Sequence, residues 1–98
     1  MWVKIHKSYR KIVAVCDENL LGKKFEEGTR QLDVRENFYN GQIISKEDLI
    51  PLLRLEAKED ATFSIVGKES IHVAVEARLI EEDSWHTIKG IPFVLVLV

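Results

Sequence analysis

The sequence predicts a small α+β domain: a small mixed sheet that begins with an N-terminal hairpin, carries two main helices packed on one face and ends in a hydrophobic C-terminal strand. Short β-branched runs cluster in the first half, two stretches with helical spacing lie in the second half, and an uncharged apolar run closes the chain. Strands that precede helices favour α+β over a doubly wound α/β sheet. Ninety-eight residues hold one core, so we expect a single domain over residues 1–98.

The N-terminal third predicts the hairpin. Two extended segments, residues 2–5 and 12–15, flank a polar stretch at residues 8–10. Leu-Leu-Gly at residues 20–22 then indicates one helical turn that ends in a left-handed glycine. The strict alternation of residues 29–34 predicts a half-buried strand.

The middle of the chain predicts a turn, a short strand and the first main helix. Phe-Tyr-Asn-Gly at residues 38–41 indicates a turn, because Asn-Gly readily takes positive φ, and residues 42–44 follow as a short strand. Ser45 can cap the helix, but Pro51 would then lie in the helix interior. We therefore expect a kink or a start at Asp48, which puts Pro51 in the first turn.

The C-terminal third predicts the second helix and the last strands. An extended segment at residues 61–66 leads to Gly67 and a helix over residues 68–79, with an apolar stripe at helical spacing. Residues 86–88 form a short strand in this interpretation. Residues 93–98 lack alternation, so we expect cover on both faces, either inside the sheet or by a second copy in a homodimer.

The charge is unevenly distributed along the chain. The net charge is −2, but residues 1–30 hold seven Lys and Arg against four acids, and the remainder holds seven against twelve. Aromatic and basic side chains on a hairpin suit RNA or an acidic protein, although an ordinary solvated surface is the alternative. No signal is specific for DNA. The predicted interaction surface comprises Lys4, His6, Lys7, Tyr9, Arg10, Lys11, Lys23 and Lys24.

Composition also restricts the location. A single cysteine allows no internal disulfide and fits a reducing compartment. The first residues lack the pattern of a signal peptide, and the apolar C-terminal run of about eight residues is too short to span a membrane. We therefore expect a cytoplasmic protein without membrane contact, and the high charge is compatible with a thermophile.

Three residues are candidates for chemistry. His72 and Glu76 are four apart on a predicted helix and therefore neighbours, as a general base with its orienting partner or as two metal ligands. Cys16 ends a strand before a helical turn, where a thiol can become reactive. A zinc site needs three or four ligands and a nucleophilic cysteine needs a positioned histidine, and the spacing supplies neither. We predict no catalytic residue, no metal and no cofactor.

The run Val-Gly-Lys-Glu-Ser at residues 66–70 superficially matches a phosphate-binding loop. That loop needs a glycine where Thr62 stands and a Ser or Thr where Glu69 stands, so the motif fails. A weaker hypothesis remains: Gly67 and Lys68 begin a helix and could hold one anion through free N–H groups.

Six short runs, taken together, resemble an archaeal family labelled domain of unknown function 424. The resemblance implies an archaeal cytoplasmic protein without an established activity, and it implies no catalytic residues. Where that family commonly has Asn, Gly and His, this chain has Ser64, Arg78 and Phe93, which puts a histidine-dependent activity in doubt. The matching runs are residues 14–17 (AVCD), 20–23 (LLGK), 25–28 (FEEG), 38–41 (FYNG), 66–68 (VGK) and 88–92 (IKGIP).

These observations favour a non-catalytic interaction module that binds a protein or ribonucleoprotein partner. One alternative is a small enzyme or an anion-binding or ligand-binding protein that uses Cys16, His72 and Glu76 or the helix start at Gly67 and Lys68. Another is a structural homodimer that forms through the C-terminal strand.

Overall fold

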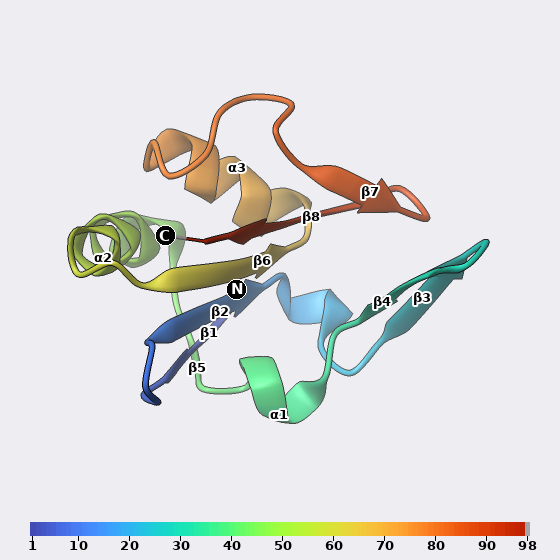
Figure 1. Ribbon diagram of the computed structural model, residues 1–98, viewed down its shortest axis with the longest axis horizontal. Coiled ribbons are helices and arrows are strands. Elements are labelled where there is room, and N and C mark those ends of the chain that lie inside the picture. The colour runs from blue at the N-terminus through green and yellow to red at the C-terminus, as the bar shows by residue number, and fades with distance from the viewer. Residues whose placement is uncertain (98) are drawn as a thin grey trace.

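The computed structural model describes residues 1–97 and confirms the α+β class (Figure 1). A six-stranded mixed sheet has the order β5-β1-β2-β6-β8-β7, and β3 and β4 form a separate two-stranded arm. The strands are β1 (Trp2–His6), β2 (Ile12–Cys16), β3 (Lys24–Glu27), β4 (Arg30–Asp33), β5 (Gln42–Ile43), β6 (Thr62–Val66), β7 (His86–Ile88) and β8 (Ile91–Val96). The helices are the 3-10 turn η1 (Glu18–Leu20), α1 (Glu36–Tyr39), α2 (Lys46–Lys58) and α3 (Lys68–Glu76).

The centre of the sheet is a parallel pair. The predicted hairpin forms, with β1 antiparallel to β2. β2 then pairs in parallel with β6, so that Ile12 lies opposite Thr62 and Cys16 opposite Val66. Because both strands end together, the residues that follow them, Asp17 and Gly67, become neighbours.

The two faces of the sheet bury separate apolar clusters. Alternation directs Val13 and Val15 toward α2 and α3, where they pack in one cluster with residues of both helices. Ala14 and Cys16 point the other way, into a cluster completed by η1, α1 and the arm. Both main helices therefore cover one face of the sheet, as predicted.

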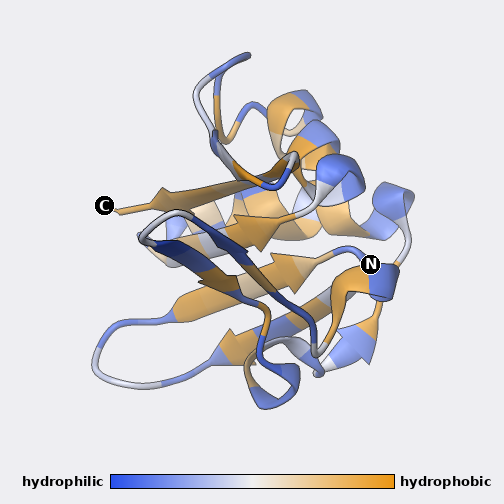
Figure 2. Ribbon diagram, turned by 90° about the vertical axis from the view of Figure 1, so that its right-hand side faces the viewer, coloured by the Kyte–Doolittle hydropathy of each residue, from blue (hydrophilic) through white to orange (hydrophobic). Residues whose placement is uncertain are grey.

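The arm was only half predicted. β4 matches the expected alternating strand, with Leu32 buried, but its partner β3 was not expected. Three of the four residues of β3 are exposed, and the arm is strongly hydrophilic in Figure 2. A strand with so little apolar surface gives no period-two signal.

The chain turns at residues 38–41, as predicted, but not through the positive φ that was expected at Asn-Gly. Phe38 and Tyr39 end the short helix α1, and Asn40 has a φ of −82°, outside the left-handed region. Glycine is needed at residue 41 for space, since a Cβ there would lie 2.3 Å from the carbonyl oxygen of Val3.

Of the two possibilities left open for the first main helix, the later start at Asp48 is wrong. α2 begins at Lys46, with no delay to Asp48, and Pro51 lies inside it. Ser45 is the N-cap, and its hydroxyl accepts a hydrogen bond from the N–H of Asp48 at 3.2 Å. This cap and the burial of Leu49 and Leu53 outweigh the one hydrogen bond that Pro51 cannot donate.

The second main helix ends earlier than predicted. α3 stops at Glu76, and Arg78 has a φ of 63°. This left-handed residue terminates the helix.

The last strand is less covered than predicted. β8 lies next to the edge strand β7, and the side chains of Leu95 and Leu97 are 60% and 71% exposed. The expectation of cover on both faces is therefore wrong for these two leucines within the chain. Val98, which that prediction included, lies outside the described residues.

Candidate functional site

Cys16 is a packed core residue. Its side chain is fully buried in the cluster on the arm side of the sheet. Burial, followed by the charge of Asp17, raises the pKa of the thiol to about 12. The thiol is therefore protonated at neutral pH, whereas a cysteine nucleophile reacts as the thiolate.

His72 and Glu76 form a surface pair, as their spacing predicted. The His72 Nε2 lies 2.8 Å from the Glu76 Oε1, and the Lys46 Nζ lies 3.0 Å from the same oxygen. The hydrogen bond from Lys46 lowers the pKa of Glu76 below its usual value. The ion pair between Lys46 and Glu76 therefore connects the start of α2 to α3. Cys16 packs against the opposite face of the sheet, so the structure does not bring it together with this pair.

Asp17 occupies the N-terminus of α3 and was not recognised from the sequence. Asp17 is only 7% exposed, and its carboxylate accepts hydrogen bonds from the Glu69 N–H at 3.1 Å, the Ser70 N–H at 2.8 Å and the Ser70 hydroxyl at 2.7 Å. A Cβ on Gly67 would lie 2.3 Å from the Asp17 carboxyl carbon. The glycine is therefore needed for the close approach of this internal carboxylate.

These hydrogen bonds reduce the number of groups that could bind an anion at Gly67 and Lys68. Two of the N–H groups that would bind an external anion already donate to Asp17. Of the predicted pair, the exposed side chain of Lys68 remains as the group that can reach a ligand. The sequence does show an Asp directly after a predicted buried strand. Its role at the start of α3 can be recognised only when the parallel register of β2 and β6 is known.

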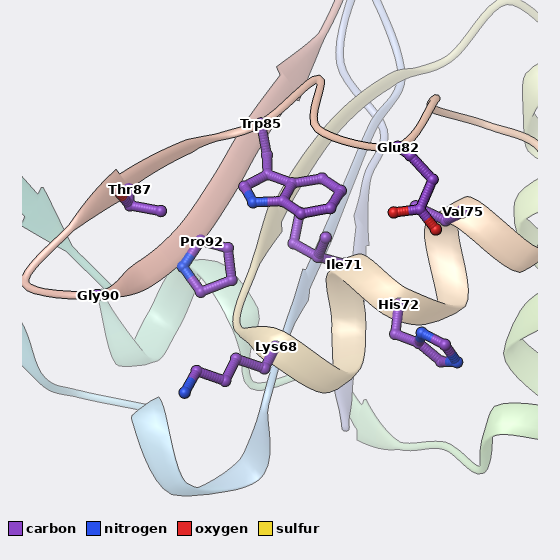
Figure 3. Close-up of a pocket in the computed structure, with 9 residues that line it drawn as sticks. All are labelled: Lys68, Ile71, His72, Val75, Glu82, Trp85, Thr87, Gly90 and Pro92. Atoms are coloured by element: carbon purple, nitrogen blue, oxygen red, sulfur yellow. The ribbon is translucent and has the colours of Figure 1, made fainter.

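A groove of about 310 Å³ lies beside this helix start (Figure 3). One wall is α3, and the other is the segment that leads through β7 into β8. Trp85 forms the floor, because its half-buried ring also packs against the helix-side core. The lining residues are Lys68, Ile71, His72, Val75, Glu82, Trp85, Thr87, Gly90 and Pro92. We call it the Trp85 groove.

One end of the Trp85 groove offers hydrogen-bond donors. In Figure 3 the side chains of Lys68 and Thr87 and the indole nitrogen of Trp85 surround Pro92 at the end nearest Gly90. The Lys68 ammonium, the Thr87 hydroxyl and the Trp85 N–H have no hydrogen-bond or ionic partner among residues 1–97. Glu82 and His72 lie toward the other end. The groove thus combines an apolar floor with donors that are free to bind a ligand.

The predicted basic surface is divided in the structure. Lys4 donates to the carbonyl of Asn37 at 2.8 Å, and Lys11 pairs with Glu56 at 3.0 Å and with Glu59 at 3.4 Å. Lys11 is thus neutralised by two carboxylates, whereas Lys4 keeps its positive charge but is held against α1.

His6 also has a structural role, since its Nε2 lies 2.8 Å from the carbonyl oxygen of Phe38 and its ring stacks on the Phe38 ring. Lys7, Tyr9 and Arg10 lie at the hairpin tip, where Tyr9 is fully exposed. Lys23 and Lys24 follow the opposite end of β2 and the turn η1, so they do not extend the tip.

Within residues 1–97, no three His, Cys, Asp or Glu side chains lie close enough to hold a metal ion. No helix in this part of the chain is long and apolar enough to cross a membrane.

The fold and the groove define a small α+β domain with a mixed six-stranded sheet, helices on one face and an open groove beside α3. The chain belongs to the family described as Protein of unknown function (DUF424), whose sequence profile matches residues 5–98. This confirms the resemblance found in the sequence.

A crystal structure of similar fold is that of an uncharacterized conserved protein from Methanopyrus kandleri. The two share 29% sequence identity with a TM-score of 0.84, and the match covers 97% of this chain and 88% of the other. Among curated proteins, no sequence matches this chain.

Proposed function

We propose that this chain is a non-catalytic interaction module of an archaeal cytoplasm, and that it binds a protein partner through the Trp85 groove. The observation that supports this most strongly is the contrast between engaged and free polar groups. Cys16, Asp17 and Glu76 are buried or paired within the fold, whereas Lys68, Thr87 and the Trp85 N–H are unpaired and lie together in a groove.

The chemistry of the groove specifies the kind of partner. An aromatic floor beside Pro92 and Ile71 suits an apolar side chain, and tryptophan is enriched among the residues that dominate binding energy at interfaces. The donor-rich end suits a carboxylate or a main-chain carbonyl. The fitting ligand is therefore a protein segment with an apolar residue next to an acidic one.

Site-specific crosslinking tests this proposal. A photoreactive amino acid replaces Thr87 in the full chain, and after exposure to extract of the source cells the crosslinked proteins are identified by mass spectrometry. We expect one protein to be captured from residue 87, and its yield to fall at least about tenfold when Lys68→Glu is added. Lys58→Glu, an equal charge reversal on α2, serves as the control and should leave the yield unchanged.

Two outcomes would contradict the proposal. Either no protein is captured from residue 87, or its capture is equally insensitive to Lys68→Glu and Lys58→Glu.

The hairpin tip favours a second candidate, contact with RNA in a ribonucleoprotein. Tyr9 is fully exposed and lies two residues from Lys7, and an exposed aromatic ring with a nearby cation can stack on an unpaired base. Binding to a fluorescent single-stranded RNA that weakens with Tyr9→Ala and with rising salt supports this candidate. Binding that is the same for Tyr9→Ala and the unaltered chain excludes it.

A further inference from the structure

The two edges of the main sheet end in different ways. At one edge, β5 pairs with Trp2 and Val3 of β1, and the rest of β1 lies beside α1, to which Lys4 and His6 are hydrogen-bonded. A charged side chain and a short helix thus protect this edge, as is usual in natural sheets. At the other edge, β7 pairs only with residues 91–93 of β8.

The unprotected part of β8 has outward-facing backbone groups. The Pro92 carbonyl accepts from the Gly67 N–H at 2.8 Å, so residue 92 faces the β6 side. Lys89 and Gly90, with φ of 53° and 76°, form the two-residue turn whose closing pair is Ile88 and Ile91. Alternation then directs the N–H and C=O groups of residues 91 and 93 toward β7. Those of residues 95 and 97 point to the same side, beyond the end of β7, where no described strand pairs with them.

Leu95 and Leu97 therefore combine two unsatisfied features. Their outward N–H and C=O groups have no hydrogen-bond partner within the part of the chain that the structure describes. Their side chains are 60% and 71% exposed, on the same face of one strand. An uncharged strand edge of this kind is a template for another strand.

We propose that two copies of this chain pair antiparallel through β8, with Leu95 of each copy opposite Leu97 of the other. The two six-stranded sheets then become one continuous sheet across a two-fold axis at Val96. Both outward-facing residues of each copy receive hydrogen-bond partners, and four leucines gather on one face. This contact is separate from the Trp85 groove and does not depend on its function.

A second copy fits this edge for three reasons. Residues 91–97 carry no charge, so two copies of the segment meet without repulsion. The interface is isologous, and β8 complements itself in this register. Phe93 already pairs with His86 of β7. A register with Leu95 opposite Leu95 of the other copy would place Leu97 opposite Phe93, so this register is blocked.

Sedimentation velocity over about 1–500 μM tests the assembly. We expect a concentration-dependent dimer, because the short strand contact lies at the small end of protein interfaces. Leu95→Lys should weaken the dimer at least about tenfold. Leu55→Lys makes the same change at an exposed leucine on α2 (56% exposed) and should leave the dimer unchanged.

Disulfide trapping tests the register. Residues in a hydrogen-bonded antiparallel pair have Cα atoms about 5.5 Å apart, which a disulfide can span. On mild oxidation, a mixture of Leu95→Cys and Leu97→Cys chains should give crosslinked heterodimers, whereas neither variant alone should crosslink efficiently.

A chain that stays monomeric to about 500 μM overturns the proposal and leaves the edge to a strand of another protein. A dimer equally sensitive to Leu95→Lys and Leu55→Lys, or a Leu95→Cys chain that crosslinks to itself, also contradicts the pairing.

Discussion

Replacing Asp17 by alanine should be among the most damaging single changes in this protein. The carboxylate accepts three hydrogen bonds at the start of α3, two of them from Ser70. It therefore connects the end of β2 to a helix more than fifty residues later in the chain. The same contact holds Lys68 at the margin of the Trp85 groove.

The expected loss of stability depends on which hydrogen-bond donors lose their acceptor when the carboxylate is removed. Ser70 is fully buried, so its N–H and its hydroxyl cannot turn to water, and each unsatisfied buried donor costs about 1–3 kcal/mol. Glu69 is exposed and its N–H can be hydrated, so it adds little. We expect Asp17→Ala to lower the free energy of unfolding by about 4 kcal/mol, a large part of the ~5–15 kcal/mol typical of a domain.

Urea unfolding followed by tryptophan fluorescence measures this change, provided that the slope of the transition stays the same. Ser70→Ala serves as the partner in a double-mutant cycle. Alone, Ser70→Ala removes the hydroxyl that donates to Asp17. In the Asp17→Ala background, the same change removes a buried hydroxyl that has lost its acceptor. The double variant should therefore be more stable than the sum of the single changes predicts, by about 1–2 kcal/mol.

Two results would refute this reasoning. The first is a loss below about 1 kcal/mol for Asp17→Ala, which would mean that water replaces the carboxylate. The second is additivity of the two changes within about 0.5 kcal/mol, which would mean that Asp17 and Ser70 act independently.

Three further predictions concern single residues. Because burial raises the pKa of the Cys16 thiol to about 12, a thiol reagent at pH 8 should label the native protein at least about a hundredfold more slowly than the urea-unfolded chain; equal rates would contradict the buried thiol. Gly41→Ala should cost about 2–3 kcal/mol in urea unfolding, because the new Cβ would meet the carbonyl of Val3, and a neutral effect would show that the backbone gives way. The lowered pKa of Glu76, caused first by Lys46, stabilises the fold above the usual value near 4.5, and this stabilisation is lost as the pH falls through the folded value. The melting temperature should therefore drop more for Glu76→Gln at pH 7 than at pH 3, and an equal drop at both would count against the ion pair.

Local patterns in the sequence were enough to predict most of the fold. The hairpin, the alternating strand β4, the cap at Ser45 and the two helices each leave a signal within about ten residues. The start of α2 was left open between Ser45 and Asp48 because Pro51 is a strong local signal, whereas its effect depends on how firmly Leu49 and Leu53 are buried. The strand β3 was missed because its residues are mostly polar.

The candidate site was much harder to predict. The role of Asp17 and the Trp85 groove both depend on pairings between distant segments, namely β2 with β6 and α3 with β7 and β8. Periodicity in one segment contains no information about which other segment it meets. His72 and Glu76 were found because helical spacing makes them neighbours. The sequence could not show that the basic residues of the predicted surface divide between the hairpin tip and the opposite end of β2.

The parallel pairing of β2 with β6 also constrains how the chain is made. The paired residues Ile12 and Thr62 are fifty positions apart, and at about 5–20 residues per second the ribosome needs roughly 3–10 s to add the intervening segment. During that time the N-terminal hairpin exists without its central neighbour, and the backbone edge of β2 that later pairs with β6 stays open to other nascent chains. Until β6 emerges, safe synthesis depends on a chaperone or another partner that covers this edge.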